Sequence, residues 1–432
     1  MTDAGHFWNS EKRVHRVFRC TFFSSNRQPV ESAAGTTTIE FWFGSTMMND
    51  HSEFLDGVRV LDLTRLLPGP FATMLFADMG ADVIKVEDPT RGDYARYYPP
   101  MVGESSAFFR SLNRNKRAVT LDLKADEGTE LFRQLVDSAD VVVESFRPGV
   151  LERLGFGIDA LRERYPELIV CSITGYGQTG PKRQAAGHDA NYLALSGLLD
   201  RNGRRGHPPH VPGFQLADIG GGALYAALGI TSALYRREQT GEGTHLDISM
   251  TEGALSFLAP AIARHSAGDV DERGDGMLTG GLPSYRVYPT ADDRYLAVAA
   301  LEPKFWAPFV EAIGAGDLAG QSMIGGEDGR EVARQIGEIL ESEPLDHWTE
   351  LFSDLDVCVE PVLELDEVLD AELHRARDVF FEMQGLTHVR TPLSGEAEPS
   401  EAPGHGEDND SVYGDLGVDD EELAELRQAG VI

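Results

Sequence analysis

The sequence predicts an α/β protein with a large, doubly wound (Rossmann-like) parallel-sheet domain and a smaller α+β domain. Short runs of aliphatic and β-branched residues alternate with stretches in which apolar residues have helical spacing, a pattern typical of a parallel sheet covered by helices. The chain has 432 residues and 41% hydrophobic content, so it is long enough for two domains and can bury a large core.

Six strands are expected in the large domain, with helical stretches between them. They are VRVLDL (58–63), ADVIKVE (81–87), AVTLDL (118–123), DVVVES (140–145), LIVCSIT (168–174) and THLDISM (244–250). The first strand runs into TRLLPGPFA and not into GxGxxG. The dinucleotide fingerprint is therefore missing, and hydride chemistry with NAD is not favoured.

The smaller domain is expected at residues 275–385, where the pattern changes. Two strand candidates flank the turn Ala291-Asp292-Asp293, a hairpin signal that is foreign to a parallel sheet. Residues 394–411 are rich in Pro, Gly and acidic residues and predict an exposed linker. We therefore assign residues 53–265 and 386–432 to the large domain.

The charge balance is strongly acidic, with 38 basic against 71 acidic residues and a formal net charge of −33. Such a surface repels nucleic acid and anionic membranes, so neither is an expected partner. Few of the basic residues are lysines, and an acidic, lysine-poor chain is typical of halophilic proteins that work in concentrated salt, where charge repulsion is screened. No apolar run is long enough for a membrane span.

The three cysteines, Cys20, Cys171 and Cys358, form no CxxC pair and have no histidine at metal-ligand spacing. Neither a disulfide framework nor a metal site is expected, and a reducing cytoplasmic location fits this pattern. Residues 1–46 carry five basic and four acidic residues, unlike the acidic remainder, and are followed by Met47 and Met48. Residues 1–52 are thus expected to be either a mis-assigned translation start or a disordered extension.

Several segments in a fixed order resemble the family III CoA-transferases (the CaiB/BaiF superfamily) from residue 55 onward and, among them, the α-methylacyl-CoA racemases. The segments include LDGVRVLDLTRLLPGPFATMLFADMGADVIKVEDP, NRNKRAVTLDLK, ESFRPGVLERLGFG, TGYGQTGP, GHDANYLALSGLL, ADIGGGAL and TGEGTHLDISM. The resemblance implies an acyl-CoA substrate, with coenzyme A arriving as part of it and no permanently bound cofactor. It also implies a homodimer in which two chains are interlocked.

Asp218, in ADIGGGAL, matches the central carboxylate of the family. The resemblance makes it either the nucleophile of a transferase or an acid/base of a racemase. The glycines that follow are expected to let the chain turn sharply into a helix, so that backbone N–H groups at Asp218, Gly220 and Gly221 could hold an oxyanion. The alternative is that Asp218 is only the N-cap of that helix.

His188, in GHDAN, matches the second catalytic base of the racemases, which transferases of the family generally lack. The alternative is a surface histidine, and the neighbouring Asp189 is interpreted as structural. Glu302, in ALEPKFW, matches the glutamate that contacts the histidine across a subunit or domain boundary. A carboxylate on one imidazole nitrogen would fix the tautomer. The alternative is an exposed acid at a helix start before Pro303.

The resemblance also assigns a CoA-binding surface on the large domain. The residues are Lys124, Arg153, Arg147 and Lys85 for the phosphates, with Leu66 and Leu67 lining the groove through their backbone. Each of these cations could instead belong to a surface ion pair. Asp88 departs from the pattern, because many family members have a CoA-binding arginine at this position.

Three functions remain open at this point. The first is racemisation or epimerisation of a 2-methylacyl-CoA, in which His188 and Asp218 transfer protons on opposite faces of Cα. The second is transfer of CoA between carboxylic acids, in which Asp218 is a covalent nucleophile. The third is a non-catalytic acyl-CoA-binding protein, which would not need His188, Asp218 and Glu302 together. His188 favours the racemase, and the identity of the acyl group is left open.

Overall fold

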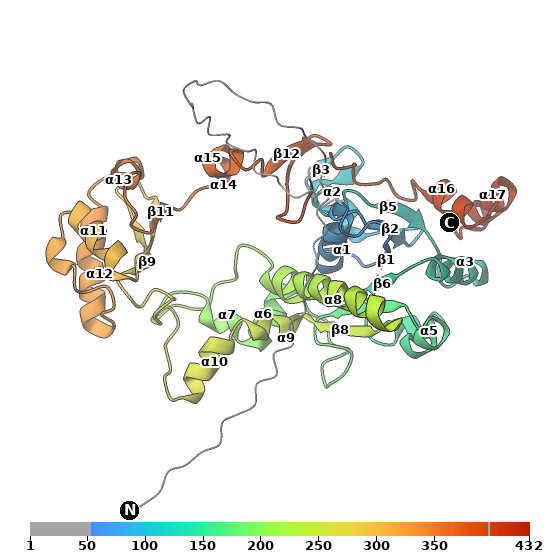
Figure 1. Cartoon of the computed structure of the whole chain (residues 1–432), viewed down its shortest axis with the longest axis horizontal. Coiled ribbons are helices and arrows are strands. Elements are labelled where there is room, and N and C mark those ends of the chain that lie inside the picture. Colours follow the sequence, from blue (N-terminus) through green and yellow to red (C-terminus); the bar gives the residue numbers. More distant parts are fainter. Residues whose placement is uncertain (1–52, 396–397) are drawn as a thin grey trace, which may run out of the picture. The chain divides into compact units, whose positions relative to one another are not determined.

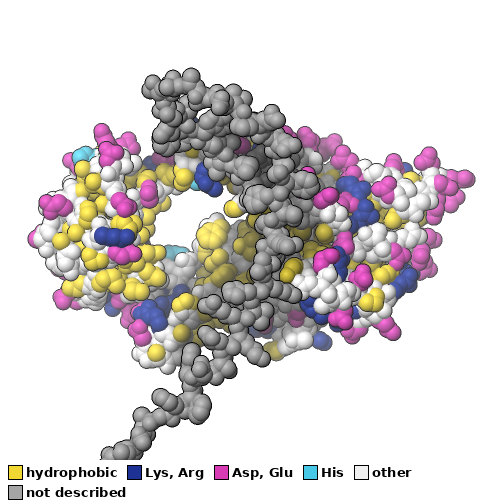
Figure 2. Space-filling view, viewed as in Figure 1, with side chains coloured by type: hydrophobic (Ala, Val, Ile, Leu, Met, Phe, Trp, Pro, Cys, Tyr) yellow, Lys and Arg dark blue, Asp and Glu magenta, His cyan; other side chains and the backbone are white. Residues whose placement is uncertain are grey.

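The structure is a computed structural model that describes residues 53–395 and 398–432. The prediction for residues 1–52 lies outside the described residues. Acidic side chains are spread over the visible face of the molecule in Figure 2, with basic side chains in smaller groups between them. Among the described helices, none has the length and apolar character needed to cross a membrane.

The large sheet has six parallel strands in the order β5-β2-β1-β6-β7-β8 (Figure 1). The strands are β1 (Arg59–Leu63), β2 (Asp82–Glu87), β5 (Arg117–Thr120), β6 (Val141–Glu144), β7 (Ile169–Thr174) and β8 (His245–Ser249). Five lie within predicted strands, and β5 overlaps the predicted 118–123 strand but begins one residue earlier, so the predicted α/β fold is confirmed. The strand order reverses between β1 and β6, which makes this the switch point where doubly wound sheets bind ligands at the carboxyl ends of their strands.

Alternate residues of the central strands enter two different cores, one on each face of the sheet. Leu61 belongs to one core and Val60 to the other. The helices of the first core are α3 (Asp126–Asp137), α5 (Ile158–Arg164), α16 (Asn409–Asp415) and α17 (Asp420–Ala429). Those of the second are α1 (Pro68–Asp78), α6 (Asp189–Ser196), α8 (Leu224–Thr240) and α9 (Met250–Ser256). The chain end thus packs on the large sheet.

A three-stranded antiparallel sheet, β11-β10-β9, forms a separate core with its own helices. The strands are β9 (Tyr285–Pro289), β10 (Tyr295–Ala299) and β11 (Val359–Pro361), and the helices are α11 (Pro303–Ala312), α12 (Gly326–Leu340) and α13 (Leu345–Phe352). The hairpin predicted around Ala291–Asp293 joins β9 to β10. The domain limits themselves remain a prediction.

Short elements connect these layers. They are η1 (Tyr94–Tyr97), β3 (Met101–Val102), β4 (Ser105–Ser106), α2 (Ala107–Leu112), α4 (Val150–Arg153), α7 (Leu198–Arg201), η2 (Ala217–Ala223), α10 (Ala259–Ser266), η3 (Gly316–Leu318), α14 (Leu365–Asp370), α15 (Glu372–Arg375), β12 (Phe380–Met383) and β13 (Leu386–Val389). Two of them, η1 and η2, position the candidate active site.

Candidate active site

Asp218 lies in η2, a π-helical segment that continues directly into α8. Single π-helical turns are rare and are frequent at functional sites. The backbone N–H groups of Ala217 and Asp218 both donate to Oδ1 of Asp189, at 2.7 and 3.0 Å. Asp189 is buried at the start of α6, so its carboxylate fixes the turn that carries Asp218. This contact agrees with the structural role expected for Asp189.

The carboxylate of Asp218 has no hydrogen-bond or ion-pair partner among the described residues. Burial raises its pKa, and the nearby charge of Asp189 adds to this, so that the pKa reaches about 7. A carboxyl group with this pKa can both accept and release a proton near neutral pH, which is what general acid–base catalysis requires. Strongly perturbed groups of this kind are typical of functional sites.

The glycines after Asp218 have a different role from the one expected. They do not form a sharp turn into a helix, because the helical conformation already begins at Leu216 and continues through Gly220 and Gly221. A Cβ atom on Gly221 would lie 2.7 Å from the carbonyl oxygen of Met250, so glycine lets η2 pack closely against α9. The prediction that the Asp218 N–H is free for an oxyanion is wrong, since Asp189 accepts it.

His188 directly precedes α6 and is exposed. Its backbone N–H donates to Oδ1 of Asn191 at 3.0 Å. Because His188 is adjacent to Asp189, the hydrogen bonds from η2 to Asp189 bring the two predicted bases to adjoining helix ends. The backbone at Asp218 therefore lies against Asp189, the residue that follows His188.

Glu302 lies before α11 in the smaller core and is exposed. In the part of the chain that the structure describes, its side chain has no hydrogen bond or ion pair, to His188 or to any other group. The structure thus places Glu302 at a helix start, as in the alternative interpretation. The contact with His188 across a subunit or domain boundary remains a prediction.

The predicted CoA-binding cations fall into two groups. Lys124, Arg147 and Arg153 are exposed and form no ion pair within the described ranges. Lys85 is completely buried, and its Nζ atom pairs with Asp93 at 2.9 Å. The prediction that Lys85 binds a phosphate is therefore wrong, because its charge is already neutralised inside the protein.

Asp88, the departure from the family pattern, follows β2 and is exposed. Burial would raise the pKa of Asp88, but hydrogen bonds from Thr90 and Arg91 and the charge of Lys124 outweigh it and lower the pKa. Lys124 is therefore close enough to Asp88 for their charges to interact. A phosphate bound by Lys124 would compete with this carboxylate.

Arg65 is a candidate binding residue that the sequence reasoning missed. It follows β1 at the switch point, and its guanidinium lies 5.0 Å from the ring centre of Tyr94 and 5.7 Å from that of Phe146. Its Nη1 atom donates to the Tyr94 hydroxyl at 3.1 Å, and no carboxylate pairs with it in residues 53–395 and 398–432. The available sequence signal was a basic residue shortly after the first predicted strand in so acidic a chain.

Glu144 was also missed. It is the last residue of β6, is buried, and accepts a hydrogen bond from the Phe146 N–H at 2.7 Å. Burial raises its pKa to about 7, although hydrogen bonds from Ser172 and from the Phe146 backbone act in the opposite direction. Glu144 therefore shapes the loop on the β6 side of the switch point.

Comparison with known proteins matches residues 55–409 to CoA-transferase family III. The human alpha-methylacyl-CoA racemase is 35% identical over 387 residues, covering 88% of this chain and 97% of that protein. The acetyl-CoA:oxalate CoA-transferase of Acetobacter aceti is 35% identical over 359 residues, covering 81% and 91%. The crystal structure of a CAIB/BAIF family protein from Brucella suis superimposes with a TM-score of 0.72 at 31% identity, covering 84% and 98%.

Proposed function

This chain belongs to CoA-transferase family III, and we propose that within the family it is a 2-methylacyl-CoA racemase or epimerase. The observation that supports the proposal is the contact of η2 with Asp189, which holds the backbone of Asp218 against the residue that follows His188. A carboxyl group with a pKa of about 7 is suited to proton transfer near neutral pH, and we propose the exposed imidazole of His188 as the second proton-transfer group.

In this mechanism one of the two groups removes the proton from Cα of the thioester. The other group returns a proton to the opposite face, so the configuration inverts. His188 and Asp218 exchange roles between the two directions of the reaction. A positioned acid or base of this kind typically contributes roughly 10² to 10⁴ in rate.

The second candidate is CoA transfer between carboxylic acids. In that reaction the Asp218 carboxylate attacks the thioester carbonyl, CoA leaves as a thiolate and a mixed anhydride forms. The thiolate then attacks the aspartyl carbonyl, which releases the first acid and leaves an aspartyl-CoA thioester. The freedom of the Asp218 carboxylate from any partner in the described residues favours this candidate, and His188 would then be dispensable. The relatives include both activities.

The proposed substrate site extends to the switch point of the sheet. Lys124, Arg147 and Arg153 are exposed cations available to the CoA phosphates, and Arg65, which follows β1, is a further candidate. Coenzyme A would enter and leave as part of the acyl-CoA substrate. No group of metal-ligating side chains occurs among the described residues, and the proposed chemistry needs none.

We also propose the interlocked homodimer implied by the family resemblance. α8 exposes a row of large apolar side chains, among which Leu228 is 64% and Tyr235 71% exposed. Exposed apolar surface of this extent is typical of an interface. A partner chain could also bring its own copy of Glu302 to His188. Sedimentation equilibrium should give twice the chain mass, and a monomer would contradict this part of the proposal.

The function is tested by incubating one epimer of a 2-methylacyl-CoA in D₂O without an acceptor acid. We expect deuterium at Cα together with the opposite epimer. His188→Gln should abolish exchange in the direction that requires His188 as base, while Asp218→Asn should damage both racemisation and CoA transfer. His347→Gln, at an exposed histidine of α13, is the matched control and should keep full exchange.

Two outcomes would contradict the racemase. Absence of exchange, with CoA moving to an added carboxylic acid through an intermediate on Asp218 that hydroxylamine traps, would establish the transferase instead. Binding of acyl-CoA with neither reaction would indicate a non-catalytic binding protein.

A further inference from the structure

Leu66 has an unusual backbone conformation in the loop between β1 and α1. Its φ angle is +68°, in the left-handed region that residues with a Cβ atom rarely adopt. The loop lies at the carboxyl end of β1, beside the switch point. Strained conformations of this kind persist only where the surrounding structure enforces them.

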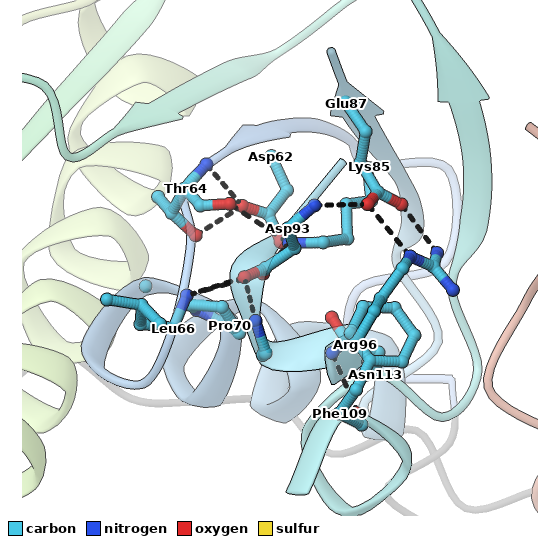
Figure 3. A network of polar contacts seen from close by, with 12 residues as sticks. Asp62, Thr64, Leu66, Pro70, Lys85, Glu87, Asp93, Arg96, Phe109 and Asn113 are labelled. Carbon is cyan, nitrogen blue, oxygen red and sulfur yellow. Dashed lines mark hydrogen bonds and ion pairs between the residues drawn. The ribbon is translucent and has the colours of Figure 1, made fainter. Parts of the chain in front are cut away.

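A buried ion pair enforces the conformation. The Leu66 N–H donates to Asp93 Oδ1 at 3.0 Å and Oδ2 at 3.3 Å. Asp93 pairs with Lys85 at 2.9 Å, and both side chains are completely buried. Lys85 Nζ also donates to the carbonyl oxygen of Thr64 at 2.9 Å. The pair therefore holds the backbone of Thr64 and Leu66, which are labelled in Figure 3 and flank Arg65 in the chain.

Asp93 also fixes the aromatic side of this site. Its Oδ1 atom accepts the backbone N–H of Ala95 at 2.9 Å and caps η1, the short helix that begins with Tyr94. Tyr94 is the residue whose ring and hydroxyl contact the Arg65 guanidinium. One carboxylate thus orders both the loop that carries Arg65 and the ring that Arg65 contacts.

A second buried pair holds the rest of the loop. Asp62 accepts hydrogen bonds from the Thr64 N–H at 2.9 Å and hydroxyl at 2.5 Å. Lys116 pairs with Asp62 at 3.1 Å and donates to the carbonyl oxygen of Pro70 at 2.9 Å. Burying four charges is costly, and such groups are more useful for fixing a geometry than for adding stability.

We propose that Asp93, held by Lys85, is a positioning residue for the acyl-CoA substrate: it fixes Leu66 and Tyr94 so that Arg65 meets a CoA phosphate at the switch point. The inference rests on the proposed acyl-CoA site. Asp93 acts through Leu66 and Arg65 and does not itself contact the substrate. Arg65 is suited to this contact because a guanidinium binds phosphate through paired N–H donors and no carboxylate among the described residues competes for it.

The test combines Asp93→Asn with Leu66→Gly. Asp93→Asn removes the charge that Lys85 needs but keeps an acceptor oxygen, and we expect about a tenfold rise in KM for acyl-CoA with kcat changed less than about twofold. Adding Leu66→Gly should restore KM to within about threefold of wild type, because glycine adopts positive φ without penalty. The double variant with Leu66→Ala, which keeps a Cβ atom, should show no rescue.

Calorimetric titration with free CoA separates this inference from the proposed function. If the wild-type protein does not bind CoA, the acyl-CoA site itself is wrong. If the wild type binds CoA and the folded Asp93→Asn variant binds it equally well, or if glycine and alanine rescue alike, Asp93 is not a positioning residue.

Arg65→Gln keeps the test decisive if Asp93→Asn fails to fold, because Arg65 lies outside the buried network. We expect about tenfold weaker CoA binding for this variant, corresponding to the loss of one charge-assisted contact. Unchanged CoA binding would overturn the proposal.

Discussion

Asp62 is completely buried and Asp218 is partly buried, and their surroundings move their pKa values in opposite directions. Burial would raise the pKa of Asp62, but Lys85 and Lys116 outweigh this and hold it well below its usual range. No cation of the described residues pairs with Asp218, so burial and the charge of Asp189 raise its pKa to about 7. The charge of Asp62 is therefore compensated by Lys85 and Lys116, whereas the charge of Asp218 in η2 is not compensated by a cation of the described residues.

This difference separates a structural use of a carboxylate from a chemical one. The paired carboxylates order a backbone, because each of their oxygens has a donor at a fixed place. The unpaired carboxylate of Asp218 orders nothing, and its ionisation is made unfavourable by its surroundings. A group in that state is suited to moving a proton or attacking a thioester at neutral pH.

The largest change in stability is expected when one of the buried ion pairs is broken. Lys116→Met leaves Asp62 in a buried site with one cation fewer and should lower the free energy of unfolding by about 3–5 kcal/mol. Urea denaturation measures the change. Lys304→Met, at an exposed lysine without an ion pair in the described ranges, should change it by less than about 0.5 kcal/mol. If both variants lost the same free energy of unfolding, the buried pair of Lys116 and Asp62 would be no more important for stability than an exposed lysine.

At Asp218, removing the charge is expected to raise the free energy of unfolding relative to wild type, whereas Lys116→Met lowers it. Because its pKa is raised from 3.8 to about 7, ionisation opposes folding, and this cost grows as the pH rises from about 4 to about 7. Asp218→Asn has no such cost. Its stability relative to wild type should therefore increase by on the order of 1–3 kcal/mol between pH 5 and pH 8, although activity is lost.

Denaturation curves of Asp218→Asn and wild type at the two pH values provide the measurement. A stability difference that does not change with pH would show that the carboxyl group has an ordinary pKa. A loss of stability at pH 8 would show that a partner compensates the charge, as in the loop after β1.

The sequence predicted the large sheet well, because the buried strands are short, aliphatic and regularly separated. It also indicated Asp218 and His188, since local motifs surround both. It could not show that Lys85 faces a buried carboxylate, because Asp93 is eight residues away in a different element and the pairing depends on the folded sheet. The role of Gly221 was missed for the same reason, since its neighbour Met250 comes from another helix.

The smallest change in stability is expected at Glu144, whose surroundings are intermediate between those of Asp62 and those of Asp218. Like Asp218 it pairs with no cation among the described residues, but it accepts hydrogen bonds, as Asp62 does. Burial raises its pKa to about 7, so the cost of its charge grows between pH 6 and pH 8.5. The free energy of unfolding of Glu144→Gln should increase by about 1 kcal/mol relative to wild type between pH 6 and pH 8.5. The amide oxygen of the variant can still accept the hydrogen bond from the Phe146 N–H.

Thermal denaturation of both proteins at pH 6 and pH 8.5 measures this difference, with Glu338→Gln on the exposed surface of α12 as the matched control. A pH-independent loss of about 2 kcal/mol or more would mean that the Phe146 and Ser172 hydrogen bonds stabilise the ionised form. Glu144 would then belong with the charge-compensated carboxylates. The expected relative stabilisation of Glu144→Gln at high pH requires that these hydrogen bonds, without a cation, do not compensate the cost of burying the ionised carboxylate.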